Sequence, residues 1–124
     1  MKPFYMTDKE YNTRNLVAVS IKHSIHNWKF GKPCILWGNR TKNEEKRCFS
    51  GYTQFLNIAE VYSLKEWQES GYGKGDICKV DEPVLMEINF CKKYKKYDTV
   101  LVPYKEYKRY CKAAHLPLDR PENW

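Results

Sequence analysis

The sequence lacks long apolar runs, closely paired cysteines and any signature of a known catalytic or metal site. Its longest apolar stretch, residues 16–21, is six residues long and already contains Ser20, whereas a membrane-spanning helix needs about 20 residues. Its amino terminus has no apolar run of signal-peptide length. We therefore expect a cytoplasmic protein with no membrane partner.

The cysteine spacing argues against a disulfide framework and against the usual zinc motifs. The five cysteines are odd in number and no two are spaced as C-x-x-C, so we expect reduced thiols that act as small buried hydrophobes. His23 and His26 precede Cys34 and Cys48, but this spacing matches no common structural zinc site. We expect no metal and no cofactor.

Catalytic motifs are missing as well. The chain contains no G-x-S-x-G nucleophile elbow, no Walker A pattern and no dinucleotide fingerprint. The glycine-rich residues 71–75 are predicted to form a surface loop. A small nucleotide-processing enzyme that pairs His23 with Glu60 and Tyr52, or uses a cysteine, stays open as an alternative, but the sequence leans against catalysis.

Positive charge, by contrast, is plentiful and unevenly placed. The chain has 22 basic and 15 acidic residues, a net charge of +7. Residues 22–47 and 92–112 carry local charges of +5 and +6, whereas residues 60–87 carry −4. Such segregation favours anionic partners. Aromatic residues lie between the cations of the first basic block, a combination that suits a phosphate joined to a base.

The first basic block and the residues just after it therefore predict a site for a phosphate-bearing ligand, preferably a nucleotide. Lysine and arginine would hold phosphate, aromatic rings would stack on a base, and histidine would donate to phosphate or sugar oxygens. The predicted site residues are Lys22, His23, His26, Trp28, Lys29, Trp37, Arg40, Lys46, Arg47 and Tyr52. Small-ligand sites often lie between subunits, so we also expect a homodimer.

The fold expected from the pattern is α+β, with a flexible N-terminal arm at residues 1–15 and a single globular domain at residues 16–124. Apolar and β-branched runs predict a mainly antiparallel or mixed sheet of about five strands, with residues 16–22 at its centre. The main strands are expected at 16–22, 33–38, 46–52 and 98–103, and shorter extended segments at 59–62, 77–80 and 84–86.

Two or three helices are expected beside this sheet. Ser63 and Glu66 have the spacing of a capping box, which predicts a helix over residues 64–70 that ends at Gly71. A short helix is expected within residues 87–97, with lysines in its last turn, and another over residues 104–114.

The segments WKFGKPCILWG (residues 28–38) and KRCFSGYT (residues 46–53), in a small chain rich in Lys, Asn and Tyr, resemble those of small phage- or prophage-encoded proteins. The resemblance implies a role in host takeover or counter-defence in the host cytoplasm, by binding and blocking rather than by catalysis. Sequestration of a cyclic or oligonucleotide signal is one such role. An inhibitor that docks on a host protein and a sequence-blind nucleic-acid binder remain alternatives.

Overall fold

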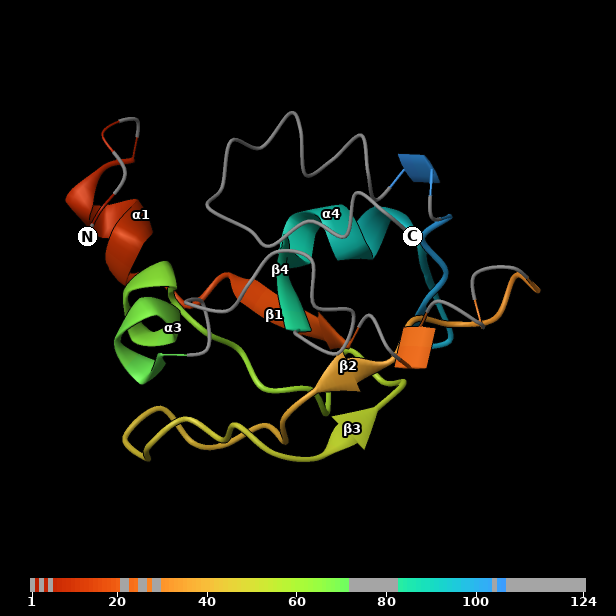
Figure 1. Ribbon diagram of the computed structural model, residues 1–124, viewed down its shortest axis with the longest axis horizontal. Coiled ribbons are helices and arrows are strands. Elements are labelled where there is room, and N and C mark those ends of the chain that lie inside the picture. The colour runs from red at the N-terminus through yellow and green to blue at the C-terminus, as the bar shows by residue number, and fades with distance from the viewer. Residues whose placement is uncertain are drawn as a thin grey trace.

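A four-stranded antiparallel sheet forms the centre of the computed structural model, with strand order β3-β2-β1-β4 (Figure 1). A separate two-stranded sheet pairs β5 with β6, and three helices lie beside the sheets within the described part of the chain. The architecture is α+β with antiparallel sheets, as expected. The structure describes residues 2, 4, 6–20, 23–24, 27, 30–71, 83–103 and 105–106.

Strand β1 (Leu16–Ser20) lies inside the sheet, as its sequence predicts. All five of its residues are buried, because β4 (Pro83–Glu87) pairs with one edge along its whole length and β2 (Leu36–Trp37) with the other edge at Val19. Side chains alternate across a strand, so a strand buried throughout is covered on both faces of the sheet.

Strands β2 and β3 (Tyr52–Thr53) form an antiparallel pair, and both are shorter than the strands expected at 33–38 and 46–52. Residues 46–51 were expected as strand and are not. Side chains bond the backbone of Cys48 in this segment, where its amide donates to Glu60 and its carbonyl accepts from the Tyr62 hydroxyl. The expected strand at 59–62 is likewise reduced to a single bridge between Tyr62 and Leu16.

Helix α3 (Leu64–Ser70) has the predicted start and end. The Ser63 side chain accepts from the Glu66 amide, and the Glu66 carboxylate accepts from the Ser63 amide, which completes the capping box. Gly71 ends the helix in the left-handed conformation at φ 88°, which glycine adopts without a steric penalty. Trp67 packs from this helix into the core.

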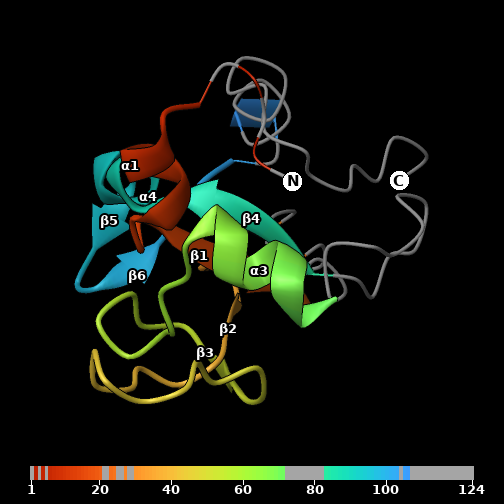
Figure 2. The same cartoon turned by 90° about the vertical axis from the view of Figure 1, so that its left-hand side faces the viewer.

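The N-terminal arm is docked in its later part. Residues Asp8–Asn12 form helix α1, which Thr7 caps and which lies beside α3 (Figures 1 and 2). The Tyr11 hydroxyl donates to Gln68 at 2.6 Å and Arg14 pairs with Glu66. The hydrogen bond of Tyr11 and the bidentate contact of Arg14 attach this part of the segment to α3.

Helix α4 (Ile88–Lys93) follows β4 directly and ends in Lys92 and Lys93, as the sequence predicts. The chain then forms the hairpin of β5 (Lys95–Lys96) and β6 (Thr99–Val100), a shorter final strand than the expected 98–103. The extended segment at 77–80 and most of the helix at 104–114 lie outside the described residues.

One apolar core joins these elements. It contains the β1 side chains, Leu36, Tyr62 and Trp67, together with the buried thiols of Cys34 and Cys91. Burial, with a smaller contribution from the neighbouring Cys34, raises the pKa of the Cys91 thiol. The burial expected for the cysteines holds for these two, Cys48 is half-buried, and Cys78 and Cys111 lie outside the described residues.

Candidate functional site

Six of the ten predicted site residues fall within the described part of the chain, and four fall outside it. Lys22, His26, Trp28 and Lys29 are the four outside. Of the other six, Arg47 belongs to a buried ion-pair network and Trp37 to an aromatic cluster. Arg40 and Lys46 lie on the long loop between β2 and β3, and His23 and Tyr52 form an exposed corner at the end of β1.

Arg47 is buried, with a side chain only 3% exposed, and it forms an ion pair with the fully buried Glu60 at 3.0 Å. Its guanidinium also donates to the backbone carbonyls of Lys42, Glu45 and Val61. A guanidinium committed in this way does not face a ligand, so the structure does not favour the predicted phosphate contact at Arg47. Sequence spacing alone does not indicate that its partner is Glu60.

The Glu60 carboxylate organises the loop between β2 and β3. It accepts hydrogen bonds from the amides of Thr41, Cys48 and Val61 and from the Thr41 hydroxyl, in addition to Arg47. Burial acts to raise the pKa of Glu60, but hydrogen bonds from Thr41 and the backbone amides outweigh it, so the pKa lies below its ordinary value. Glu60 is therefore a structural anion, and the structure does not support the general base considered for it.

Trp37 belongs to an aromatic cluster with Phe49 and Trp67. Its ring meets Trp67 edge-on with centroids 5.9 Å apart and Phe49 at 6.4 Å, both close to T-shaped. Trp37 is half-buried and lies directly across from Tyr52 in the β2–β3 pair. Its ring thus packs against Phe49 and Trp67, which does not favour the predicted stacking on a base.

Arg40 and Lys46 lie on the same long loop but in different surroundings. The Arg40 guanidinium donates to the carbonyls of Ala59 at 2.7 Å and Leu56 at 2.9 Å, while the residue as a whole stays exposed. Lys46 is exposed beside Arg47 in the sequence. Within the described part of the chain no contact joins Arg40 or Lys46 to His23, and the other two predicted lysines, Lys22 and Lys29, lie outside it.

The exposed corner at the end of β1 brings together His23 and Tyr52, two predicted site residues that are far apart in sequence. Their ring centroids are 4.3 Å apart with the planes tilted by 42°. Both residues are exposed, Tyr52 to 56%. The His23 Nδ1 atom lies 2.8 Å from the hydroxyl of Ser20, the last residue of β1.

Ser20 was not predicted as a site residue, yet it sets the orientation of the His23 ring. Its side chain is buried, and within the described residues His23 is the one hydrogen-bond partner of its hydroxyl. The direction of this hydrogen bond depends on the His23 tautomer. In the tautomer in which the Ser20 hydroxyl donates, Nδ1 accepts and Nε2 carries the ring proton, which makes Nε2 a donor suited to an anionic oxygen.

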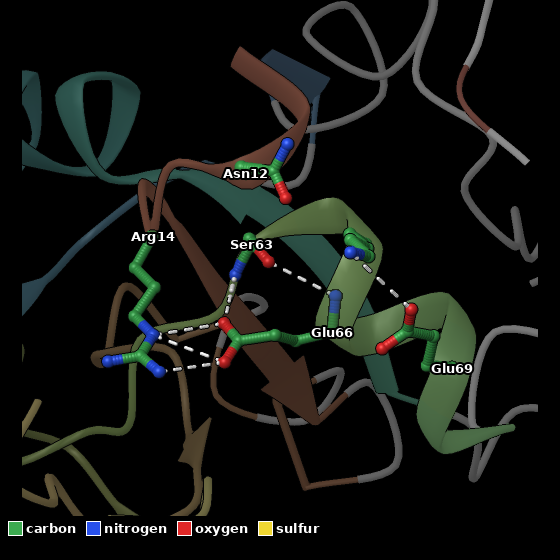
Figure 3. Close-up of a pocket in the computed structure, with 6 residues that line it drawn as sticks. Asn12, Arg14, Ser63, Glu66 and Glu69 are labelled. Carbon is green, nitrogen blue, oxygen red and sulfur yellow. Dashed lines mark hydrogen bonds and ion pairs between the residues drawn. The ribbon is translucent and has the colours of Figure 1, made fainter. Parts of the chain in front are cut away.

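A separate polar hollow of about 410 Å³ lies between α1 and the start of α3 (Figure 3). There the Arg14 guanidinium donates three hydrogen bonds of 2.9–3.2 Å to the Glu66 carboxylate. Burial acts to raise the pKa of Glu66, but hydrogen bonds from Arg14 and Ser63 lower it below its ordinary value. The remaining pair, Lys65 and Glu69, is also balanced in charge, so this hollow shows no preference for an anion.

Within the described residues no three His, Cys, Asp or Glu side chains come close enough together to hold a metal ion. Over the same residues no helix is both long and apolar enough to cross a membrane. Comparisons of the chain with protein-family models, with curated proteins and with solved structures found no match.

Proposed function

We propose that the protein is a non-enzymatic binding protein for a phosphate-bearing ligand, with a nucleotide as the preferred class. The observation that carries the proposal is the exposed corner at which Ser20 holds His23 against Tyr52. The Nε2–H of His23 would donate to a phosphate oxygen. The face or hydroxyl of Tyr52 would meet the base or sugar.

The chemistry of the corner favours binding over catalysis. Ser20 is only 4% exposed, so its hydroxyl positions the imidazole and does not reach a substrate as a nucleophile would. Glu60, the carboxylate considered for an acid–base mechanism, is fully buried and accepts five hydrogen bonds.

The net charge of +7 supports an anionic ligand independently of the corner. Positive charge raises the local concentration of anions and speeds their association. The sequence places Lys22 immediately before His23, and Lys32 follows in the next segment, where it is exposed. Sequestration of a signalling nucleotide in a host cytoplasm is the biological role that this binding and the resemblance to phage proteins would serve together.

The test is a calorimetric titration of the protein with inorganic pyrophosphate, ADP and a cyclic dinucleotide. A lost hydrogen bond to a charged group is worth about 1.5–3 kcal/mol, so His23→Ala should weaken a bound ligand by roughly 10- to 150-fold. Tyr52→Phe keeps the ring and Tyr52→Ala removes it, which separates the hydroxyl from the stack.

The control is Asn57→Ala, an exposed polar residue on the neighbouring turn, which should bind as the parent protein does. Unaltered ligand recovered after binding supports a binder. A ligand that is consumed, or one whose affinity is the same in His23→Ala and the parent, contradicts the proposal.

A further inference from the structure

A second basic surface lies on α4 and the β5–β6 hairpin, remote in sequence from the corner at His23. Four lysines, all exposed, occupy the last turn of α4 and strand β5: Lys92, Lys93, Lys95 and Lys96. Asp98 is the one acidic residue between positions 92 and 100, and it pairs with Lys95 at 3.6 Å. The surface therefore keeps a strong local positive charge. Figure 2 shows the hairpin beside α4 at the edge of the molecule.

The tip of the hairpin presents an aromatic ring to solvent. Tyr97 is 87% exposed, and the Lys96 ammonium lies 5.9 Å from the centre of its ring. Tyr97 and Asp98 have φ of 52° and 64°, the pattern of a two-residue type I′ turn, which normally takes Asn and Gly. A bulky residue in this conformation is disfavoured, so the turn carries an exposed ring at some cost to its own stability.

A second ring and a further cation adjoin the hairpin through the turn at residues 55–59. Phe55, which is 44% exposed, bridges to Thr99, and the Leu56 amide donates to the Asp98 carbonyl at 2.7 Å. Arg40 binds the far side of the same turn through its backbone and its guanidinium. Arg40, a cation of the first basic block, is thus connected to the hairpin through the turn at residues 55–59.

We propose that this surface binds single-stranded nucleic acid without regard to sequence. Lysines spaced along a helix end and a strand would neutralise successive phosphates. The exposed rings of Tyr97 and Phe55 would stack on unpaired bases, which all have a flat π-face. A duplex hides those faces, and an anionic membrane would require an amphipathic helix with an apolar face; α4 instead buries Cys91 in the core and is six residues long.

The proposal does not rest on the nucleotide site at His23, because its residues and its probe are different. The probe is a fluorescently labelled 12-residue oligothymidylate, followed by anisotropy between 50 and 200 mM salt. Four neutralised phosphates give a slope of about −2.8 in log K against log salt, so the affinity should fall about 50-fold over that range.

The informative variant is Lys93→Ala with Lys96→Ala, which leaves the Lys95–Asp98 pair in place. Losing two phosphate contacts should reduce the slope to about −1.4, a fall of only about 7-fold over the same range. The matched control is Lys9→Ala with Lys65→Ala, two exposed lysines on α1 and α3, which makes the same change in net charge and should keep the parent slope.

Tyr97→Asn tests the stacking role against folding. Asn suits the type I′ turn better than Tyr, so the variant should melt at the same or a higher temperature while binding oligothymidylate about 5- to 150-fold more weakly. The proposal is overturned if the Lys93/Lys96 variant has the slope of the Lys9/Lys65 control. It is overturned as well if a 12-base-pair duplex binds as tightly as the single strand, or if phosphatidylserine vesicles bind and oligothymidylate does not.

Discussion

Replacing Glu60 with Gln removes the charge at the centre of the buried network and leaves Arg47 without its counter-ion. Breaking a buried ion pair by removing one partner costs about 3–5 kcal/mol. The Gln amide group would also face at least one of the donors that now point at the carboxylate, from Thr41, Cys48 or Val61, and a buried unsatisfied donor adds about 1–3 kcal/mol. We expect a total loss of about 4–8 kcal/mol.

Arg47→Met should be less damaging than Glu60→Gln. The carboxylate would keep its four other hydrogen bonds, from the Thr41 hydroxyl and three backbone amides, and Met fills much of the space of the Arg stem. We expect a loss of about 3 kcal/mol, at the lower end for a broken buried pair. Arg47→Met also removes the donor to the Lys42, Glu45 and Val61 carbonyls. Because Glu60 makes five hydrogen bonds and Arg47 makes four, we still expect Glu60→Gln to be the more damaging variant.

Urea unfolding followed by circular dichroism measures both losses through the midpoint at constant m-value. Glu69→Gln is the control, because Glu69 is exposed and its pair with Lys65 is 4.0 Å long, so its effect should stay within about 0.5 kcal/mol. The reasoning is refuted if Glu60→Gln unfolds with the control, or if Arg47→Met is the more damaging of the two.

Two further predictions concern the same network. The pKa values of Glu60 and Glu66 lie below the ordinary 4.5, so the stability that these carboxylates contribute is present above about pH 4.5 and is lost as the pH falls through the lowered values. Melting temperatures measured from pH 7 to pH 3 should therefore fall most steeply below pH 4.5. A flat profile would contradict this prediction. Gly38→Ala places a Cβ 2.5 Å from the Tyr62 hydroxyl and 2.7 Å from the Glu60 Cβ at φ 81°, and should lose about 2–5 kcal/mol. Gly31→Ala, at φ 64° in open space, should lose only about 1–2 kcal/mol; equal losses would show that the close approach does not matter.

Local sequence signals predicted the elements whose stability is local. The capping box at Ser63 and Glu66, the Gly71 end of α3 and the continuous burial of β1 all follow from residue types at fixed spacing. Within the expected strand at 33–38 the burial alternates, since Cys34, Leu36 and Gly38 are buried while Ile35 and Trp37 are half-buried.

The long loop between β2 and β3 could not be predicted, because the interactions that shape it are distant in sequence. Residues 46–52 have the composition of a strand, but Glu60 and Tyr62 supply the hydrogen bonds that a neighbouring strand would have supplied. A carboxylate in an otherwise apolar segment, AEVY, was the one available signal, since a fully buried acid requires a partner.

The candidate site was predictable only in part for the same reason. The residue types that bind phosphate are evident in the sequence, but their burial is not. Arg47 is buried in an ion pair, and the half-buried Trp37 packs against Trp67. His23 and Tyr52 meet because β1 and β3 are placed by β2 between them. Ser20 gave no signal, because a serine at a strand end has many ordinary roles.

The central claim is that an anion binds where Ser20, His23 and Tyr52 meet. The most direct measurement is a ¹H–¹⁵N NMR titration of the assigned protein with ADP at constant pH and salt. The account predicts saturable shifts at the amides of residues 20, 23 and 52, absent in His23→Ala. Shifts that are missing there at millimolar ADP, or that centre on the hollow lined by Arg14 and Glu69, would contradict it.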